Sequence, residues 1–416
     1  MLFKDVIGQQ SIKEQLAQMV QHNRLSHALL FLGKEGSGAL PLALAFSQYI
    51  VCTDAAQAKS SAGGLFETEA DLTDNKAVTM DSCGVCPACL KASQLVHPDI
   101  HYSYPVITQK SGDRSISVDF ISEWREFITS FPYGNIYDWL QFIGAENKQG
   151  NITAEECNNI NKKLSLKGFE SKYKILIMWM PEFLGKEGNK LLKLIEEPPP
   201  NTLFIFVAED ENALLPTILS RVQLVKLPLL KDEDIEEALV NRCNEGELKS
   251  RQLAAIAEGN YREALKLLQH ADEDWLSLLR DWLNAIVKTG PIAQVKWIDE
   301  MSKLGREKQK QFLKYFIHLL EQAVRLRLII HQSPIGENKA NHTDSALLLD
   351  KIPSVERDFA LRLNKMCLIS AQRAIVEELN KSMYHIERNA NAKMLFHALT
   401  IRIYHIIKDN SLILIN

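Results

Sequence analysis

The segment that most constrains the fold is LFLGKEGSGALPLALAF, which runs from Leu30 to Phe46. A short apolar run, a glycine-rich turn and a stretch with helical character follow one another in it. This order is typical of a phosphate-binding loop, in which a buried strand leads into a helix whose first backbone N–H groups hold an anion. The segment therefore predicts the backbone shape of a nucleotide site.

The loop lacks the side chains that would bind a phosphate. A phosphate-binding loop reads G-x-x-x-x-G-K-[ST], where the Lys neutralises the outer phosphates and the hydroxyl binds magnesium. The glycines are present, but apolar residues occupy the Lys and hydroxyl positions, and Lys34 stands at the wrong end of the loop. The residues of this degenerate loop are Gly33, Gly36, Gly38, Ala39 at the Lys position and Leu40 at the hydroxyl position.

An acidic residue that should follow a later strand is also missing. In such sites a carboxylate at the end of a second apolar strand helps to hold magnesium. ILIMWMPEF ends its apolar run in Met178–Met180, and the first carboxylate is that of Glu182. Without the lysine, the hydroxyl and the carboxylate, most of the electrostatic stabilisation of phosphoryl transfer is gone. We expect no ATP hydrolysis and no bound nucleotide; the alternative is a glycine-rich turn that never bound one.

Apolar runs along the first half of the chain predict a sheet. The runs at 28–32, 172–180 and 202–210 are short and continuous, which is typical of buried strands. Segments with helical character lie between them, and this alternation predicts an α/β fold with a parallel, three-layer sheet up to about residue 228. Beyond that point the pattern is helical to the end of the chain.

Seven cysteines are unevenly placed, and three of them lie within seven residues. DSCGVCPACL sets Cys83, Cys86 and Cys89 at C-x2-C-x2-C spacing, where a glycine and a proline favour tight turns. Four soft sulfur ligands suit tetrahedral zinc, and Cys52 is the best candidate for the fourth. The alternatives are free buried thiols and an iron–sulfur cluster, although the Cys-Pro pair of a ferredoxin run does not follow. We predict a structural zinc site.

Composition excludes some classes of protein. With 46% hydrophobic residues, 24% charged residues and a net charge of −4, the chain is typical of a globular protein, not of a wholly basic nucleic-acid binder. No apolar run approaches the ~20 residues of a membrane helix. MLFKDVIGQQ has neither the basic nor the apolar part of a signal peptide. We expect a cytoplasmic protein.

Three blocks of the sequence resemble the AAA+ subunits of sliding-clamp loaders. The first is FKDVIGQQSIKEQLAQMVQHNRLSHALLFLGKEGSG, the second is NKLLKLIEEPPPNTLFIFVAEDENALLPTILSRVQ, and the third is GNYREALKLL. The resemblance covers roughly residues 1–52, 83–105 and 150–270. In the Ser-Arg-Cys signature of the family, Ser220 and Arg221 are kept. The Cys is replaced by a valine.

The resemblance implies a division into domains. Residues 1–228 would form the AAA+ core, with its zinc module. Residues 229–272 would form a helical lid, and 273–416 a helical collar for oligomerisation. Relative to the family, 53–82 and 115–148 look like insertions, and the family's zinc module supports Cys52 as the fourth ligand.

The resemblance also implies a function. It suggests a subunit that hydrolyses no ATP itself, and supplies Arg221, with Ser220, as an arginine finger to the active site of its neighbour. Its partners would be gamma/tau-type ATPase subunits and a clamp-opening delta subunit in a hetero-pentamer. This complex, as part of a DNA polymerase holoenzyme, would load the sliding clamp onto primed DNA. The alternatives are an active NTPase with an unusual loop and a zinc-stabilised AAA+ scaffold outside replication.

Overall fold

The structure is a computed structural model that describes residues 1–53, 81–107, 115–145, 150–269, 275–332, 354–388 and 390–409. The chain separates into two compact units. One comprises Met1–Glu245 with Ala257–Ala264, and the other comprises Gly246–Ile256 with Leu265–Asn416. The separate lid over 229–272 and collar over 273–416 stay predictions. Most of the insertion predicted at 53–82 lies outside the described residues.

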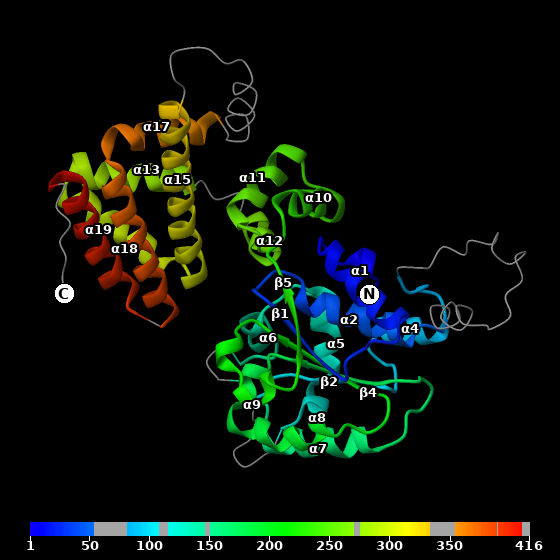
Figure 1. The fold of residues 1–416 in the computed structure, drawn as a ribbon. Helices are drawn as coiled ribbons and strands as arrows, with labels where there is room; N and C mark the ends of the chain where they lie inside the picture. The colour runs from blue at the N-terminus through cyan, green and yellow to red at the C-terminus, as the bar shows by residue number, and fades with distance from the viewer. Residues whose placement is uncertain are drawn as a thin grey trace, which may run out of the picture. The chain divides into compact units, whose positions relative to one another are not determined.

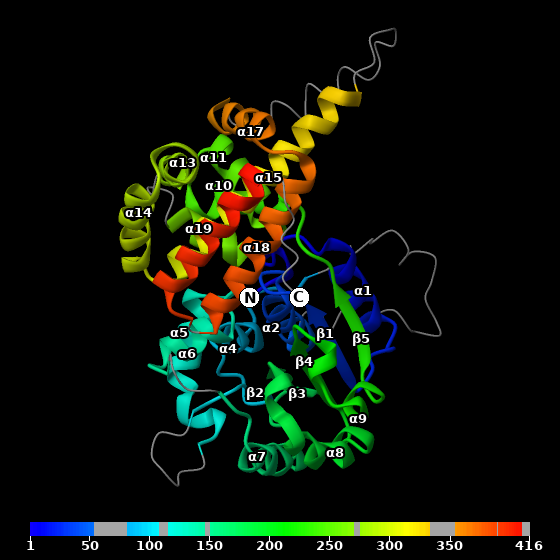
Figure 2. The ribbon, with the colours of Figure 1, turned by 90° about the vertical axis from the view of Figure 1, so that its left-hand side faces the viewer.

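The first unit (Figure 1) contains a parallel sheet of five strands in the order β2-β3-β4-β1-β5, and all five are labelled in Figure 2. The three predicted strands are confirmed, and two short strands that the apolar pattern did not reveal lie at the sheet edges. The strands are β1 (Ala28–Gly33), β2 (Ile100–Ser103), β3 (Lys174–Trp179), β4 (Thr202–Ala208) and β5 (Gln223–Leu227).

Helices cover both faces of this sheet, which confirms the three-layer α/β fold. Alternate side chains of β4 enter two different apolar clusters: Leu203, Ile205 and Val207 enter one, while Phe204 and Phe206 enter the other. Both faces are therefore buried, as parallel sheets require. The first cluster includes side chains of α1 (Gln10–Gln21), α2 (Ala39–Val51), α4 (Pro87–Ser93), α5 (Ile121–Ser130) and α6 (Ile136–Phe142). The second includes side chains of α7 (Ala154–Ser165), the 3-10 helix Pro181–Leu191, α8 (Leu192–Glu196) and α9 (Pro216–Leu219).

The described part of the segment 115–148 belongs to the core of the first unit. Trp124 of α5 stacks on Tyr104 with ring centroids 4.0 Å apart, and its ring lies 5.3 Å from that of Trp179 at the end of β3. Trp139 of α6 donates its indole N–H to the carbonyl oxygen of Pro105 at 2.7 Å. The segment therefore packs against the end of β3, where Trp179 lines the space beside the glycine loop.

The remaining helices confirm the helical pattern of the second half. In the second unit, Trp282 stacks on Trp297 with centroids 4.7 Å apart inside an apolar core. Among the residues that the structure describes, no helix has the length and apolarity to cross a membrane. After α10 (Asp232–Cys243), the helices are α11 (Glu247–Ala257), α12 (Tyr261–Gln269), α13 (Trp275–Asn284), a π-helix (Ala285–Thr289), α14 (Pro291–Lys303), α15 (Arg306–Gln332), α17 (Ser354–Met366), α18 (Ile369–Glu387) and α19 (Ala392–Asp409).

Candidate functional site

The glycine loop joins β1 to α2, as the sequence predicts. Gly36 and Gly38 have φ angles of +73° and +90°, a left-handed conformation that glycine adopts without strain. The two residues at the Lys and hydroxyl positions are part of the core, because Ala39 and Leu40 are only 8% and 4% exposed. The loop therefore keeps the backbone of a phosphate site, while the positions that would face the ligand are used for apolar packing.

The space beside the loop is small. It measures about 30 Å³ for the centre of a water-sized sphere, and on this scale one buried water needs roughly 10–15 Å³. Tyr133, which follows α5, closes it from the side. Its ring carbon Cε1 lies 3.2 Å from where a Cβ on Gly38 would stand, and its hydroxyl accepts a hydrogen bond from the Ile7 N–H at 2.8 Å.

The charges around the loop also disfavour a phosphate. Glu35 and Glu209 line this space together with the exposed Lys34. Burial, together with the negative charge of Glu35, raises the pKa of Glu209 to about 7. Glu182, the first carboxylate after β3, accepts hydrogen bonds from the backbone N–H groups of Glu209 and Asp210 at 2.6 and 3.1 Å. It therefore ties the ends of β3 and β4 together.

Arg221 lies between α9 and β5, and the structure brings it together with Ser220. Its side chain is 33% exposed. The Nε atom donates to Glu196 Oε1 at 2.5 Å, and Nη1 donates to the carbonyl oxygen of Thr217 at 2.8 Å and to Ser220 Oγ at 2.9 Å. The guanidinium is thus held in one orientation at the surface of this chain, and its role in a neighbouring active site stays a prediction.

Sequence reasoning misses several of these residues. Tyr133 lies in a segment that looks like an insertion relative to the family, and Glu196 has the pattern of a charge pair at a helix end. Arg262 is part of GNYREALKLL, but nothing in that block singles it out, although it forms ion pairs with Glu35 and Asp138. The only signal for it is an arginine at the start of a helix in a block that resembles the family.

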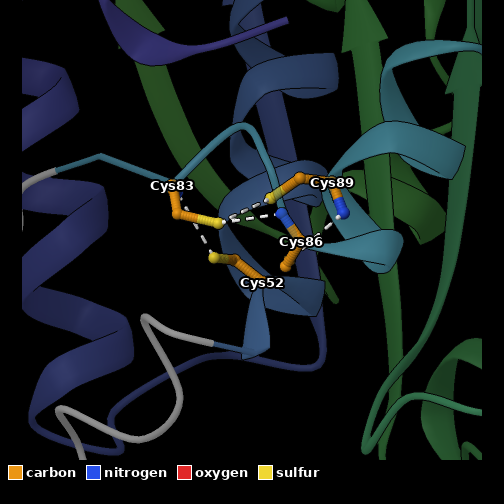
Figure 3. A group of neighbouring side chains, drawn as sticks. All are labelled: Cys52, Cys83, Cys86 and Cys89. Carbon is orange, nitrogen blue, oxygen red and sulfur yellow. Dashed lines mark hydrogen bonds between the residues drawn. The ribbon is translucent and has the colours of Figure 1, made fainter.

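The four predicted metal ligands come together at one place (Figure 3). Cys52 follows the end of α2, Cys86 caps the start of α4, and Cys83 and Cys89 lie beside them. All four sulfur atoms lie within 4.8 Å of one another, and those of Cys83 and Cys89 are 3.9 Å apart. Four thiolates about 2.3 Å from a tetrahedral zinc would be about 3.8 Å apart, so the spacing fits such an ion.

Backbone N–H groups support this cluster. The amides of Cys83, Cys86 and Cys89 donate to the sulfur atoms of Cys52, Cys83 and Cys86 at 3.4, 3.3 and 3.5 Å. Burial opposes ionisation of Cys86, but hydrogen bonds from Thr53 and from the Cys89 amide lower its pKa to about 6. Burial raises the pKa of the Cys89 thiol. Donors that stabilise thiolates, in a largely buried set of four sulfurs, are what a closed structural metal site needs.

The fold and these sites define an α/β protein whose phosphate-loop-type turn is packed by the chain's own side chains. A parallel sheet with a strand–glycine loop–helix unit precedes a helical second half, and the loop has Ala39 and Leu40 in place of the lysine and the hydroxyl of a phosphate site. A family model described as DNA polymerase III, delta subunit, matches residues 8–64 and 65–231, which is more than half of the chain. The chain belongs to this family.

Similar proteins agree with this family. The chain is 24% identical over 260 residues to the DNA polymerase III subunit delta' of Bacillus subtilis, covering 62% of this chain and 59% of the relative. It is 23% identical over 423 residues to the DNA polymerase III subunit tau of the same organism, covering 96% of this chain and 61% of the relative. The chain thus spans less than two thirds of these relatives.

A solved structure with some likeness is a DNA polymerase III gamma subunit-related protein of Thermotoga maritima. It is 14% identical, with a TM-score of 0.37, over 94% of this chain and 98% of that one. A likeness at this level carries no argument about function.

Proposed function

We propose that this chain is an ATPase-deficient, delta-prime-type subunit of the clamp loader of bacterial DNA polymerase III. The observation that carries the proposal is the closed glycine loop, with Ala39 and Leu40 buried in the core, in a member of this family. In the cytoplasm it would assemble with gamma/tau-type ATPase subunits and a delta subunit, and the complex would load the sliding clamp onto primed DNA. Contacts with DNA would be to backbone phosphates and independent of sequence.

In this proposal Arg221 acts on the ATP of the neighbouring subunit. A guanidinium is planar and always charged, so it stabilises the charge that develops on a transferring phosphoryl group. It can do so from a chain that binds no nucleotide. The partly exposed position of Arg221 and its fixed orientation support this function, since contacts with Glu196, Thr217 and Ser220 hold the guanidinium at the surface.

The test is the DNA-stimulated ATPase of the reconstituted loader with the wild-type chain and with Arg221→Ala. We expect kcat at the one site that Arg221 serves to fall by about 10³–10⁵-fold. The steady-state ATPase rate of the whole loader should then fall by the fraction of turnover that this site contributes. Gel filtration should show that assembly is unchanged. Arg373→Ala is the matched control, because Arg373 is also exposed and paired with a carboxylate, that of Glu377. An unchanged rate in an intact complex rejects the finger.

We propose further that Cys52, Cys83, Cys86 and Cys89 hold a structural zinc ion. With four protein ligands there would be no open position for catalysis, so the ion would stabilise the packing of α4 against α2. Metal analysis of the purified chain should give one zinc per chain, and Cys89→Ser should lower this content and the melting temperature. Cys157→Ser is the control for a buried thiol outside the cluster. Iron in place of zinc, or no metal, would contradict the proposal.

A further inference from the structure

Arg262 is a buried arginine whose charge is neutralised by the chain itself. It lies in the first turn of α12, and its side chain is only 8% exposed. The guanidinium forms a bidentate pair with Asp138 of α6, in which Nη2 donates to Oδ1 at 2.6 Å and Nε donates to Oδ2. Nη1 donates to Glu35 Oε1 at 2.6 Å. Two carboxylates from distant parts of the sequence therefore hold one cation.

Glu35 lies in the glycine loop itself and is fully engaged. Besides Arg262, its Oε1 accepts a hydrogen bond from Asn260 Nδ2 at 3.3 Å, and its Oε2 accepts one from Asn135 Nδ2 at 2.8 Å. Burial alone would raise the pKa of Glu35, but the charge of Arg262 and these hydrogen bonds lower it, so the group is ionised at neutral pH. A single loop carboxylate thus connects the loop to α6 and to the start of α12.

The backbone of the same segment also contacts the loop directly. The Tyr261 N–H donates to the carbonyl oxygen of Gly36 at 3.4 Å. A Cβ on Gly36 would stand 2.9 Å from the Cα of Asn260, so the two backbones approach as closely as glycine allows. The ring of Tyr261 meets that of Tyr133 edge to face, with centroids 4.9 Å apart. These contacts pack residues 257–264 directly against the loop.

We propose that Arg262, Glu35 and Asp138 form a latch that fixes Ala257–Ala264 on the glycine loop without any nucleotide. A loop of this shape is built to hold an anion, and an arginine beside it would ordinarily be neutralised by that anion. Here carboxylates of the chain have replaced the phosphate as partners of the arginine. The loop is consequently a site that is permanently occupied by the protein's own side chains. This inference does not depend on the action of Arg221 or on assembly into a loader.

Hydrogen exchange of the full chain tests the latch. The probes are the amides of Tyr261 and Ala264, which bond to Gly36 and Asn260. Arg262→Lys keeps the charge but loses the bidentate geometry, and Asp138→Asn keeps the shape but loses the charge. We expect both variants to speed exchange of these amides by about 10- to 100-fold, since charge-assisted hydrogen bonds in a buried site are lost. Amides of the second unit should not change.

Lys34→Gln is the matched control, because it removes an exposed charge from the same loop next to Glu35. It should leave the exchange of both amides unchanged. Should a variant at 262 or 138 fail to fold, Glu35→Gln, which removes one of the two carboxylates, gives the same measurement with a milder change.

Two results would overturn the proposal. One is unchanged exchange of the Tyr261 and Ala264 amides in the folded variants. The other is slower exchange of these amides in the wild-type chain when ATP or ADP is added with magnesium, since a nucleotide would then help to hold residues 257–264 on the loop. The first result overturns the latch and leaves the proposed function untouched, whereas the second also counts against the closed loop on which the proposed function rests, so the two outcomes distinguish the failures.

Discussion

Substitution of two glycines by alanine separates the cost of a left-handed backbone from the cost of a close approach. Gly36 in the loop and Gly144 after α6 have φ angles of +73° and +69°. A Cβ on Gly144 would have no heavy atom within 4 Å, whereas one on Gly36 would stand 1.9 Å from Asn260 Oδ1 and 2.9 Å from its Cα. The two positions lie in the same unit of the chain. They therefore form a matched pair.

The expected magnitudes follow from these distances. At Gly144 the alanine pays only for its left-handed backbone, about 1–2 kcal/mol. At Gly36 the Asn260 side chain must also move, which breaks its hydrogen bonds to Glu35 and to the Glu263 N–H, at about 1 kcal/mol each. The overlap with the backbone of Asn260 cannot be relieved by a rotamer change, and such overpacking costs about 1–3 kcal/mol. We expect Gly36→Ala to cost roughly 3–5 kcal/mol more than Gly144→Ala.

Urea titration, with exchange of the β1 and β4 amides as the probe for the first unit, measures both variants. Equal losses in the free energy of unfolding would refute the reasoning, because the close contact between the loop and Asn260 would then contribute nothing. A large loss at Gly144 would also refute the reasoning, since no heavy atom of the described residues lies within 4 Å of a Cβ at that position.

Two further predictions concern single carboxylates. The folded pKa of Glu209, about 7, lies above its ordinary value of 4.5, so its contribution to stability is complete below pH 4.5 and is lost as the pH rises through 7. Glu209→Gln should therefore raise the free energy of unfolding at pH 8 by up to about 3 kcal/mol, with a higher melting temperature. The gain should be much smaller at pH 5. An equal gain at both pH values would contradict this. Glu196→Gln should lower the ATPase rate of the loader by releasing Arg221, while the melting temperature changes little, as for an exposed pair. Glu197→Gln is the control and should change neither the ATPase rate nor the melting temperature. Equal ATPase rates in the two variants would show that Glu196 does not position Arg221.

The sequence predicts the strands whose residues form continuous apolar runs. The central strands β1 and β4 are buried along their whole length, and apart from Thr202 at the start of β4 their sequences carry no polar side chain. The edge strand β5 alternates, with three exposed residues in QLVKL, and β2 has only four residues. Such short or half-exposed strands give a weak signal, because the apolar pattern depends on burial of both faces.

The candidate sites differ in the same way. The cysteine cluster was predictable because three ligands are close in sequence and sulfur at that spacing has few other uses. The partners of Arg262 were not, because Asp138 and Glu35 lie 124 and 227 residues away. Long-range ion pairs leave no periodic pattern, so only the folded chain shows which carboxylate meets which arginine.

The burial of α2 makes the state of the loop hard to reverse in evolution. Every residue of this helix, from Ala39 to Val51, is buried. A single Ala39→Lys change would restore the consensus letter but place a long side chain at a position that is only 8% exposed, where overpacking costs about 1–3 kcal/mol. Regaining nucleotide binding would require Leu40, Tyr133 and the partners of Arg262 to change as well. Substitutions on the exposed side of the loop would cost little, but a return to nucleotide binding would pass through single variants that are less stable than the present chain.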